Sequence, residues 1–161
     1  MADTVEFSLG GVDALIAKLE AVSYDMKRKG GRSALRKAAQ LVANKMTENA
    51  LRLDDPDTGR SIAKNVALRW NGRLFKQTGN LGFRVGVLHG AVLKNGGDTG
   101  ANAPTPYWRL LEFGTEKMAA TPFARKALAD NINEATNAFI SEYEKAIDRA
   151  LRRAAKGSGS N

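Results

Sequence analysis

The chain has 161 residues, of which 43% are hydrophobic and 26% are charged, proportions that suit one globular domain with a real core. Its formal charge of +8 at pH 7 indicates an anionic partner, which could be nucleic acid, an anionic surface or an acidic protein. The absence of cysteine excludes disulfides, thiolate metal sites and cysteine nucleophiles. No apolar run has the length needed to cross a bilayer, and the N-terminus does not have the pattern of a signal peptide.

A strand and two amphipathic helices are predicted in the N-terminal third of the chain. Residues 4–9 alternate between apolar and polar side chains, as in a half-buried strand. In residues 12–22, apolar side chains recur at intervals of three and four, which predicts a first helix. Gly30 and Gly31 interrupt a basic run, so a second helix is predicted to begin after them, over residues 33–53.

An acidic stretch, residues 54–59, ends the second predicted helix. Three acids in four residues are typical of the start of a calcium loop, but the glutamate that closes such a loop is missing. The favoured interpretation is a turn in which Asp57 or Thr58 caps the next segment. One helical turn is predicted over residues 60–65, and neither a metal nor a cofactor is predicted.

In the middle of the chain, the spacing of apolar side chains changes to a period of two. Residues 66–70 alternate in polarity, and Asn71 with Gly72 is a strong hairpin signal because both residues tolerate positive φ. The segment 74–77 is therefore predicted to be the returning strand, and residues 81–92 a further strand. The fold class predicted is α+β, with a small antiparallel sheet of three to four strands packed with long helices from the N- and C-terminal parts.

Residues 94–106 are rich in Gly, Asn, Thr and Pro and are predicted to form a loop. Loops of this length are commonly functional or disordered. Two interpretations remain open: a flexible loop, or a segment that becomes ordered against a neighbouring subunit.

Aromatic side chains are concentrated in the segment that follows, which Gly114 ends. It offers more large apolar side chains than a short strand or turn needs, and aromatic residues often dominate protein interfaces. An assembly interface is therefore predicted at Tyr107, Trp108, Phe113 and Phe123.

The last predicted helix runs from Pro122 to about Ala155, with Thr121 as its cap and the proline at its first position. Its length of about 50 Å is large for a domain of this size, so part of it is expected to pack on another chain. One domain is predicted over residues 1–156, with a flexible tail over residues 157–161.

No catalytic constellation is recognisable in the sequence, and the protein is predicted not to be an enzyme. The single histidine, His89, has no accompanying nucleophile motif. Glu112 lies among aromatic residues, where burial would raise its pKa unless Arg109 or Arg125 supplied a compensating charge.

Two clusters of basic side chains could contact phosphates. No base-reading motif or aromatic ladder is interleaved with them, so solvated helix faces are the alternative. For the second cluster, a favourable interaction with the helix dipole is a further explanation. The predicted basic surface comprises Arg28, Lys29, Arg32, Arg36, Lys37, Arg149, Arg152 and Arg153.

The sequence resembles a known family in several short motifs. EFGT at residues 112–115, followed by PFAR at 122–125 and AL at 127–128, is similar to the gene-product-ten-like family of phage tail-completion proteins. Weaker similarities are LGG at residues 9–11 before an amphipathic helix, and RVGV at residues 84–87 as a strand. Members of this family are small virion proteins at the head–tail neck of long-tailed double-stranded DNA phages.

The resemblance implies a structural virion protein that assembles as a ring, expected to be hexameric, around the DNA conduit. The implied partners are neighbouring neck and tail-tube proteins and double-stranded DNA that passes through the lumen without sequence recognition, with no membrane involved. The implied location is the head–tail neck, after synthesis in the bacterial cytoplasm. The alternatives are a stand-alone nonspecific DNA-binding protein, and a tail terminator or head-completion ring at an adjacent level of the neck.

Overall fold

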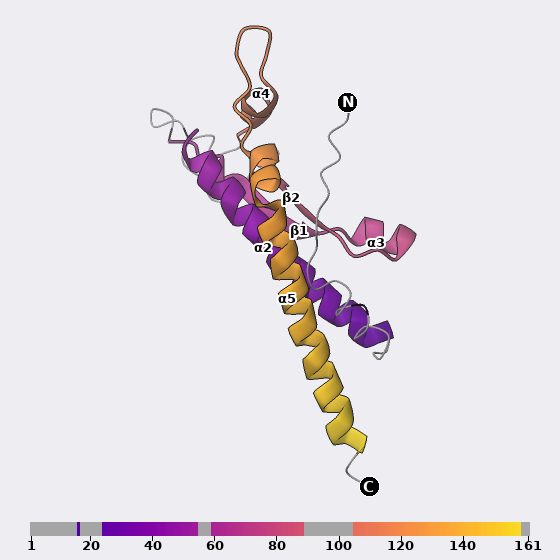
Figure 1. Ribbon diagram of the computed structural model, residues 1–161. Helices are drawn as coiled ribbons and strands as arrows, with labels where there is room; N and C mark the ends of the chain where they lie inside the picture. Colours follow the sequence, from indigo (N-terminus) through magenta and orange to yellow (C-terminus); the bar gives the residue numbers. More distant parts are fainter. Residues whose placement is uncertain (1–15, 17–23, 55–58, 89–104, 159–161) are drawn as a thin grey trace, which may run out of the picture.

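The computed structural model describes residue 16 and residues 24–54, 59–88 and 105–158. Figure 1 shows two long helices that cross, with a small hairpin beside the first and a short helix near the start of the second. The predicted strand over residues 4–9, and all of the predicted first helix except Ile16, lie outside the described residues. The elements in chain order are α2 (Tyr24–Leu51), η1 (Ala63–Asn65), β1 (Val66–Trp70), α3 (Gly72–Thr78), β2 (Phe83–Val87), α4 (Trp108–Phe113) and α5 (Ala124–Ser158).

Helix α2 is continuous through Gly30 and Gly31, so the predicted interruption there was wrong. The two glycines lie against side chains of α5. A Cβ atom added at Gly30 would lie 3.2 Å from the Cβ of Ala146, and one at Gly31 would lie 3.4 Å from the ring of Tyr143. Glycine in a helix costs about 1 kcal/mol relative to alanine. Here it admits the Tyr143 side chain, whose hydroxyl donates a 3.0 Å hydrogen bond to the carbonyl of Lys27.

The fold is α+β, as predicted, with a two-stranded antiparallel sheet in the described part of the chain rather than three or four strands. β1 pairs with β2 in a register that places Val66 opposite Val87 and Trp70 opposite Phe83. The prediction of a strand at residues 74–77 was wrong, because this segment belongs to α3.

The Asn71–Gly72 pair starts a helix instead of closing a hairpin. The Asn71 side chain accepts a hydrogen bond of 3.2 Å from the backbone N–H of Leu74, which is the contact of an N-cap. Gly79, with φ of 74°, ends the helix in the left-handed conformation. The strands are thus joined by a capped two-turn helix.

The main core lies where the C-terminal half of α2, η1 and the start of α5 meet. Small side chains from the two long helices surround two large ones, Ile62 and Phe123. A second cluster joins Ile140 and Ile147 further along α5. The buried members of the main core are Met46, Ala50, Ile62, Ala63, Phe123 and Ala127.

Helix α5 has 35 residues, which corresponds to about 50 Å. It ends at Ser158, so Gly157 and Ser158 are helical rather than part of the predicted tail. The division into one domain and a flexible tail remains a prediction.

Candidate functional site

The junction between α4 and α5 is organised by a buried carboxylate. Glu112 is only 1% exposed, and its two oxygens accept hydrogen bonds from the backbone N–H groups of Phe123 (2.8 Å), Ala124 (3.0 Å) and Arg125 (3.0 Å). These N–H groups belong to the start of α5 and have no partner within the helix. The carboxylate therefore caps α5 from a different helix.

The predicted cap, Thr121 followed by Pro122, was wrong. The Thr121 hydroxyl donates a long hydrogen bond of 3.4 Å to the carbonyl of Leu111, which also accepts one of 2.8 Å from the Thr121 N–H. Thr121 thus fastens the connector to α4, while Glu112 satisfies the helix terminus.

Arg125 supplies the charge that the buried Glu112 needs. Its Nε donates to the carboxylate at 3.1 Å, and its Nη2 donates to the Glu112 carbonyl at 2.6 Å. Burial raises the pKa of Glu112, but the backbone hydrogen bonds from Ala124, Arg125 and Phe123 and the Arg125 side chain together outweigh it. The pKa of Glu112 is therefore lowered, and the carboxylate is ionised at neutral pH.

The four aromatic residues of the predicted interface occupy different environments. Phe123 is 1% exposed and belongs to the main core. Tyr107 and Trp108 are half-buried and pack against that core. Phe113 is 63% exposed, with the Arg125 guanidinium 4.9 Å from its ring centroid. Among these four, Phe113 is therefore the side chain that is most available to a partner, while the interface itself remains a prediction.

The connector between α4 and α5, residues 114–121, projects beyond α4 (Figure 1). A tight turn shapes it, because the Thr115 N–H donates to the Met118 carbonyl at 2.8 Å. Gly114 has φ of 75°, and a Cβ atom there would lie 2.8 Å from the same carbonyl. Only glycine fits this position without moving the backbone.

Large apolar side chains are exposed in α4, in this connector and in the N-terminal part of α5. Single exposed apolar residues are normal, whereas several in one region commonly mark an interaction surface. We call this set the apolar surface: Leu110, Phe113, Met118, Leu128 and Ile132.

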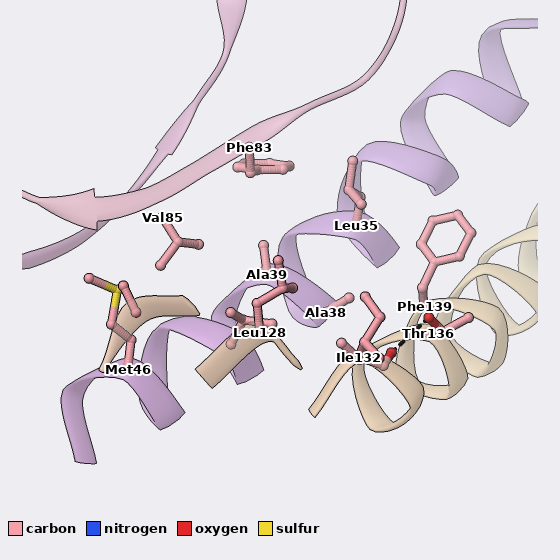
Figure 2. A pocket seen from close by; sticks show the side chains of 13 residues that line it. Leu35, Ala38, Ala39, Met46, Phe83, Val85, Leu128, Ile132, Thr136 and Phe139 are labelled. Atoms are coloured by element: carbon pink, nitrogen blue, oxygen red, sulfur yellow. Dashed lines mark hydrogen bonds between the residues drawn. The ribbon is translucent and has the colours of Figure 1, made fainter. Parts of the chain in front are cut away.

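An open groove of about 480 Å³ adjoins the apolar surface, between α5 and β2 and over α2. Figure 2 shows Phe83 and Val85 on the strand side and Leu128 and Ile132 on the α5 side. None of the side chains that line the groove is charged. The polar one, Thr136, donates its hydroxyl proton to the Ile132 carbonyl at 2.8 Å. The groove therefore suits apolar side chains rather than a polar ligand.

The first basic cluster lies between α2 and the β1–α3–β2 segment. Lys29, Arg32 and Arg36 line a hollow of about 550 Å³ together with Trp70. Arg28, with Lys29 and Arg32, lines an adjoining hollow of about 280 Å³. Four of the predicted basic residues are thus neighbours on one side of α2.

Lys37 lies outside this group and donates a hydrogen bond to Glu142 on α5. Hydrogen bonds from Lys37 and Lys145 lower the pKa of Glu142, which keeps its carboxylate ionised. Lys37 therefore stabilises the contact between α2 and α5.

The C-terminal basic cluster approaches the first one across the helix crossing. Lys29, Arg149 and Arg153 line a third hollow, of about 340 Å³, while Arg152 is exposed outside it. Lys29 thus joins two clusters that are about 120 residues apart in the sequence. We call the joined set the basic band: Arg28, Lys29, Arg32, Arg36, Arg149 and Arg153.

Comparison with known families decides the identity of the chain. A family model described as "Bacteriophage HK97-gp10, putative tail-component" matches residues 13–114. The chain belongs to the HK97-gp10-like family. The description of the family names a tail component of a bacteriophage, which supports a structural role in the phage tail and a location in the virion. No curated protein and no solved structure matches the chain.

The HK97-gp10-like match ends at Gly114, so it contains most of the EFGT motif but neither the PFAR motif nor α5. The structure nevertheless joins the two motifs directly, since Glu112 of the first holds the backbone of Phe123 and Arg125 in the second.

Among the described residues, no group of three or more His, Cys, Asp or Glu could hold a metal ion. Asp54 accepts hydrogen bonds from the Ser61 hydroxyl (2.6 Å) and the Ile62 N–H (2.7 Å), so it stabilises the turn before η1. Asp57, Thr58 and His89 lie outside the described residues. Within the described helices, none is long and apolar enough to cross a membrane.

Sequence reasoning missed the groove and the aromatic partners of the arginines. Both depend on contacts between segments that are far apart in the chain, as between Arg32 and Trp70. The apolar spacing of α5 did indicate Leu128 and Ile132, but it did not indicate that these residues would stay exposed.

Proposed function

We propose that this HK97-gp10-like protein is a tail-completion or joining component of the head–tail neck or tail end, which assembles as a ring around the DNA conduit. The observation that carries the proposal is the exposed apolar surface beside an uncharged groove. A monomer leaves both in water, whereas neighbouring copies that contact one another through them would bury both. The resemblance favours a hexamer, with adjoining neck and tail-tube proteins as further partners.

A substitution of Phe113 tests whether this side chain contributes to assembly or only to the fold of the monomer. Phe113→Ala is expected to change the thermal stability of the monomer little, because the ring is 63% exposed. Incorporation into particles is expected to fall at least tenfold, as for a dominant interface aromatic. Leu51→Ala is the matched control, since Leu51 is 60% exposed at the end of α2 and lies outside the apolar surface. Equal incorporation of the two variants would contradict the assignment.

The proposed role is structural and requires no catalysis. His89→Ala is therefore expected to leave particle assembly and infectivity unchanged, as measured by plaque titre in a complementation assay. A severe loss of infectivity from a normally folded variant would argue for chemistry at this residue.

The position of the protein along the head–tail axis of the virion is tested by growing a phage that lacks the protein. A tail-completion protein predicts filled heads and separate, unjoined tails in electron micrographs. Tails of uncontrolled length would instead indicate a tail terminator, and leaking heads a head-completion ring. Normal infectious particles would favour a stand-alone DNA-binding protein made and used in the bacterial cytoplasm.

A further inference from the structure

We infer that the basic band binds the phosphate backbone of duplex DNA, with Arg28 and Arg32 as its principal contacts. This inference rests on the proposed function, in which DNA passes through the ring, and it identifies the surface that would face the DNA.

Aromatic rings hold the two principal arginines in place. The Arg32 guanidinium lies 4.2 Å from the centroid of the Trp70 ring, and the Arg28 guanidinium lies 4.7 Å from that of Phe75. A guanidinium stacked on a ring keeps its N–H groups around the edge of its plane, where they can bind a phosphate in a bidentate manner. Because stacking already restrains the side chain, less conformational entropy is lost when a phosphate binds.

The charges of the band are not neutralised by the described part of the chain. Within it, no carboxylate lies within 4.0 Å of Arg28, Lys29, Arg32 or Arg36, whereas Lys37, the next basic residue of α2, is paired with Glu142. An unpaired cluster of this kind attracts a polyanion and releases the counterions condensed on it.

The spacing of the arginines suits a regular backbone. Arg28, Arg32 and Arg36 follow one another at intervals of four residues, or about 6 Å along α2, and remain on one side of the helix. Lys29, shared by the three hollows, extends the band to Arg149. The band is thus a series of cations rather than a single anion site.

The same stacking favours duplex over single-stranded DNA. Proteins that bind single strands expose aromatic faces on which bases stack. Here arginines occupy faces of Trp70 and Phe75, so these faces are covered. The band therefore offers contacts to phosphates but no platform for bases.

The test is binding of a short labelled duplex of random sequence to the purified full chain, measured by fluorescence anisotropy over a range of salt. Six phosphate contacts predict a slope of about −5 in the plot of log affinity against log salt. The double variant Arg28→Gln/Arg32→Gln is expected to reduce the magnitude of this slope by about 2. The matched control Lys37→Gln/Lys126→Gln removes the same charge from two ion-paired residues and is expected to keep the slope.

A charge-preserving variant distinguishes the loss of phosphate contacts from misfolding of the chain. Arg28→Lys/Arg32→Lys keeps both charges but loses the planar stack, so the slope should persist while affinity falls several-fold. Retention of the wild-type slope by the glutamine variant, or its loss from the lysine variant, would overturn the inference. Tighter binding of a single strand or of polyglutamate would do so as well. Absence of DNA binding by the wild-type chain, together with its normal incorporation into particles, would refute this inference and leave the proposed function standing.

Discussion

Phe123→Ala is expected to destabilise the fold by about 3–5 kcal/mol, the usual effect of truncating a buried phenylalanine. Phe123 is 1% exposed, and it fills the space between the small residues of α2 and α5, including Ala50 and Ala127. Alanine at this position would leave a cavity that the helices can close only in part. Since small domains are stable by about 5–15 kcal/mol, the variant should lose much of its stability.

Urea unfolding followed by circular dichroism measures this effect. Phe113→Ala is the matched control, because it makes the same substitution at a ring that is 63% exposed. Its midpoint should stay close to that of the wild type. A Phe123→Ala variant that unfolds at the wild-type urea concentration would show that the core assigned to Phe123 does not hold the two helices together.

Glu112→Ala is expected to be similarly damaging, at about 3 kcal/mol or more, because each buried donor left without its acceptor costs about 1–3 kcal/mol. It removes the acceptor of three backbone N–H groups and of the Arg125 side chain. Glu112→Gln keeps the shape but not the charge, and it should cost about 2 kcal/mol, because hydrogen bonds to a charged acceptor are stronger. Glu116→Ala on the exposed connector is the control, with little change expected.

The stability difference between wild type and Glu112→Gln should depend on pH. Because the pKa of Glu112 is lowered in the folded state, its contribution is fully present above the unfolded value of 4.5. The contribution is lost as the pH falls through the lower, folded pKa. The difference between the two proteins should therefore shrink below pH 4.5 in urea titrations. A difference that stays constant into strong acid would mean that the carboxylate is not the stabilising group.

The elements that periodicity predicted correctly are those whose pattern is local. The apolar spacing over residues 33–53 coincides with α2 as far as Leu51, where the helix ends, and the alternation over residues 66–70 is strand β1. The helical turn predicted before that strand contains η1. In these segments the side-chain pattern and the tertiary contacts favour the same structure.

The wrong predictions concern residues that are compatible with two local structures. In each case, a contact with a distant segment of the chain determines which structure forms. Asn71 with Gly72 fits a tight hairpin turn, yet the asparagine side chain caps α3 instead and also accepts a 2.8 Å hydrogen bond from Arg84. Gly30 and Gly31 looked like a helix break, but they provide room for Tyr143. Neither choice is visible without the partner, which lies elsewhere in the chain.

For the candidate site as well, the sequence indicated some of the residues that lie together and did not indicate others. The sequence indicated Arg125 as a candidate partner for Glu112, and it indicated all six residues of the basic band, as members of two separate clusters. It did not reveal that the Glu112 carboxylate caps α5, because this contact crosses the turn at Gly114. Nor did it separate Lys37 from its basic neighbours, since only the approach of α5 places Glu142 beside it.

Quantitative mass spectrometry of gradient-purified phage particles tests the central claim most directly, namely that this HK97-gp10-like protein is built into the virion as a ring. We expect a small, fixed number of copies per particle, close to six for the proposed hexamer, that resists washing in high salt. Absence of the protein from infectious particles, while it remains abundant in the lysate from which they were purified, would contradict a role as a virion component.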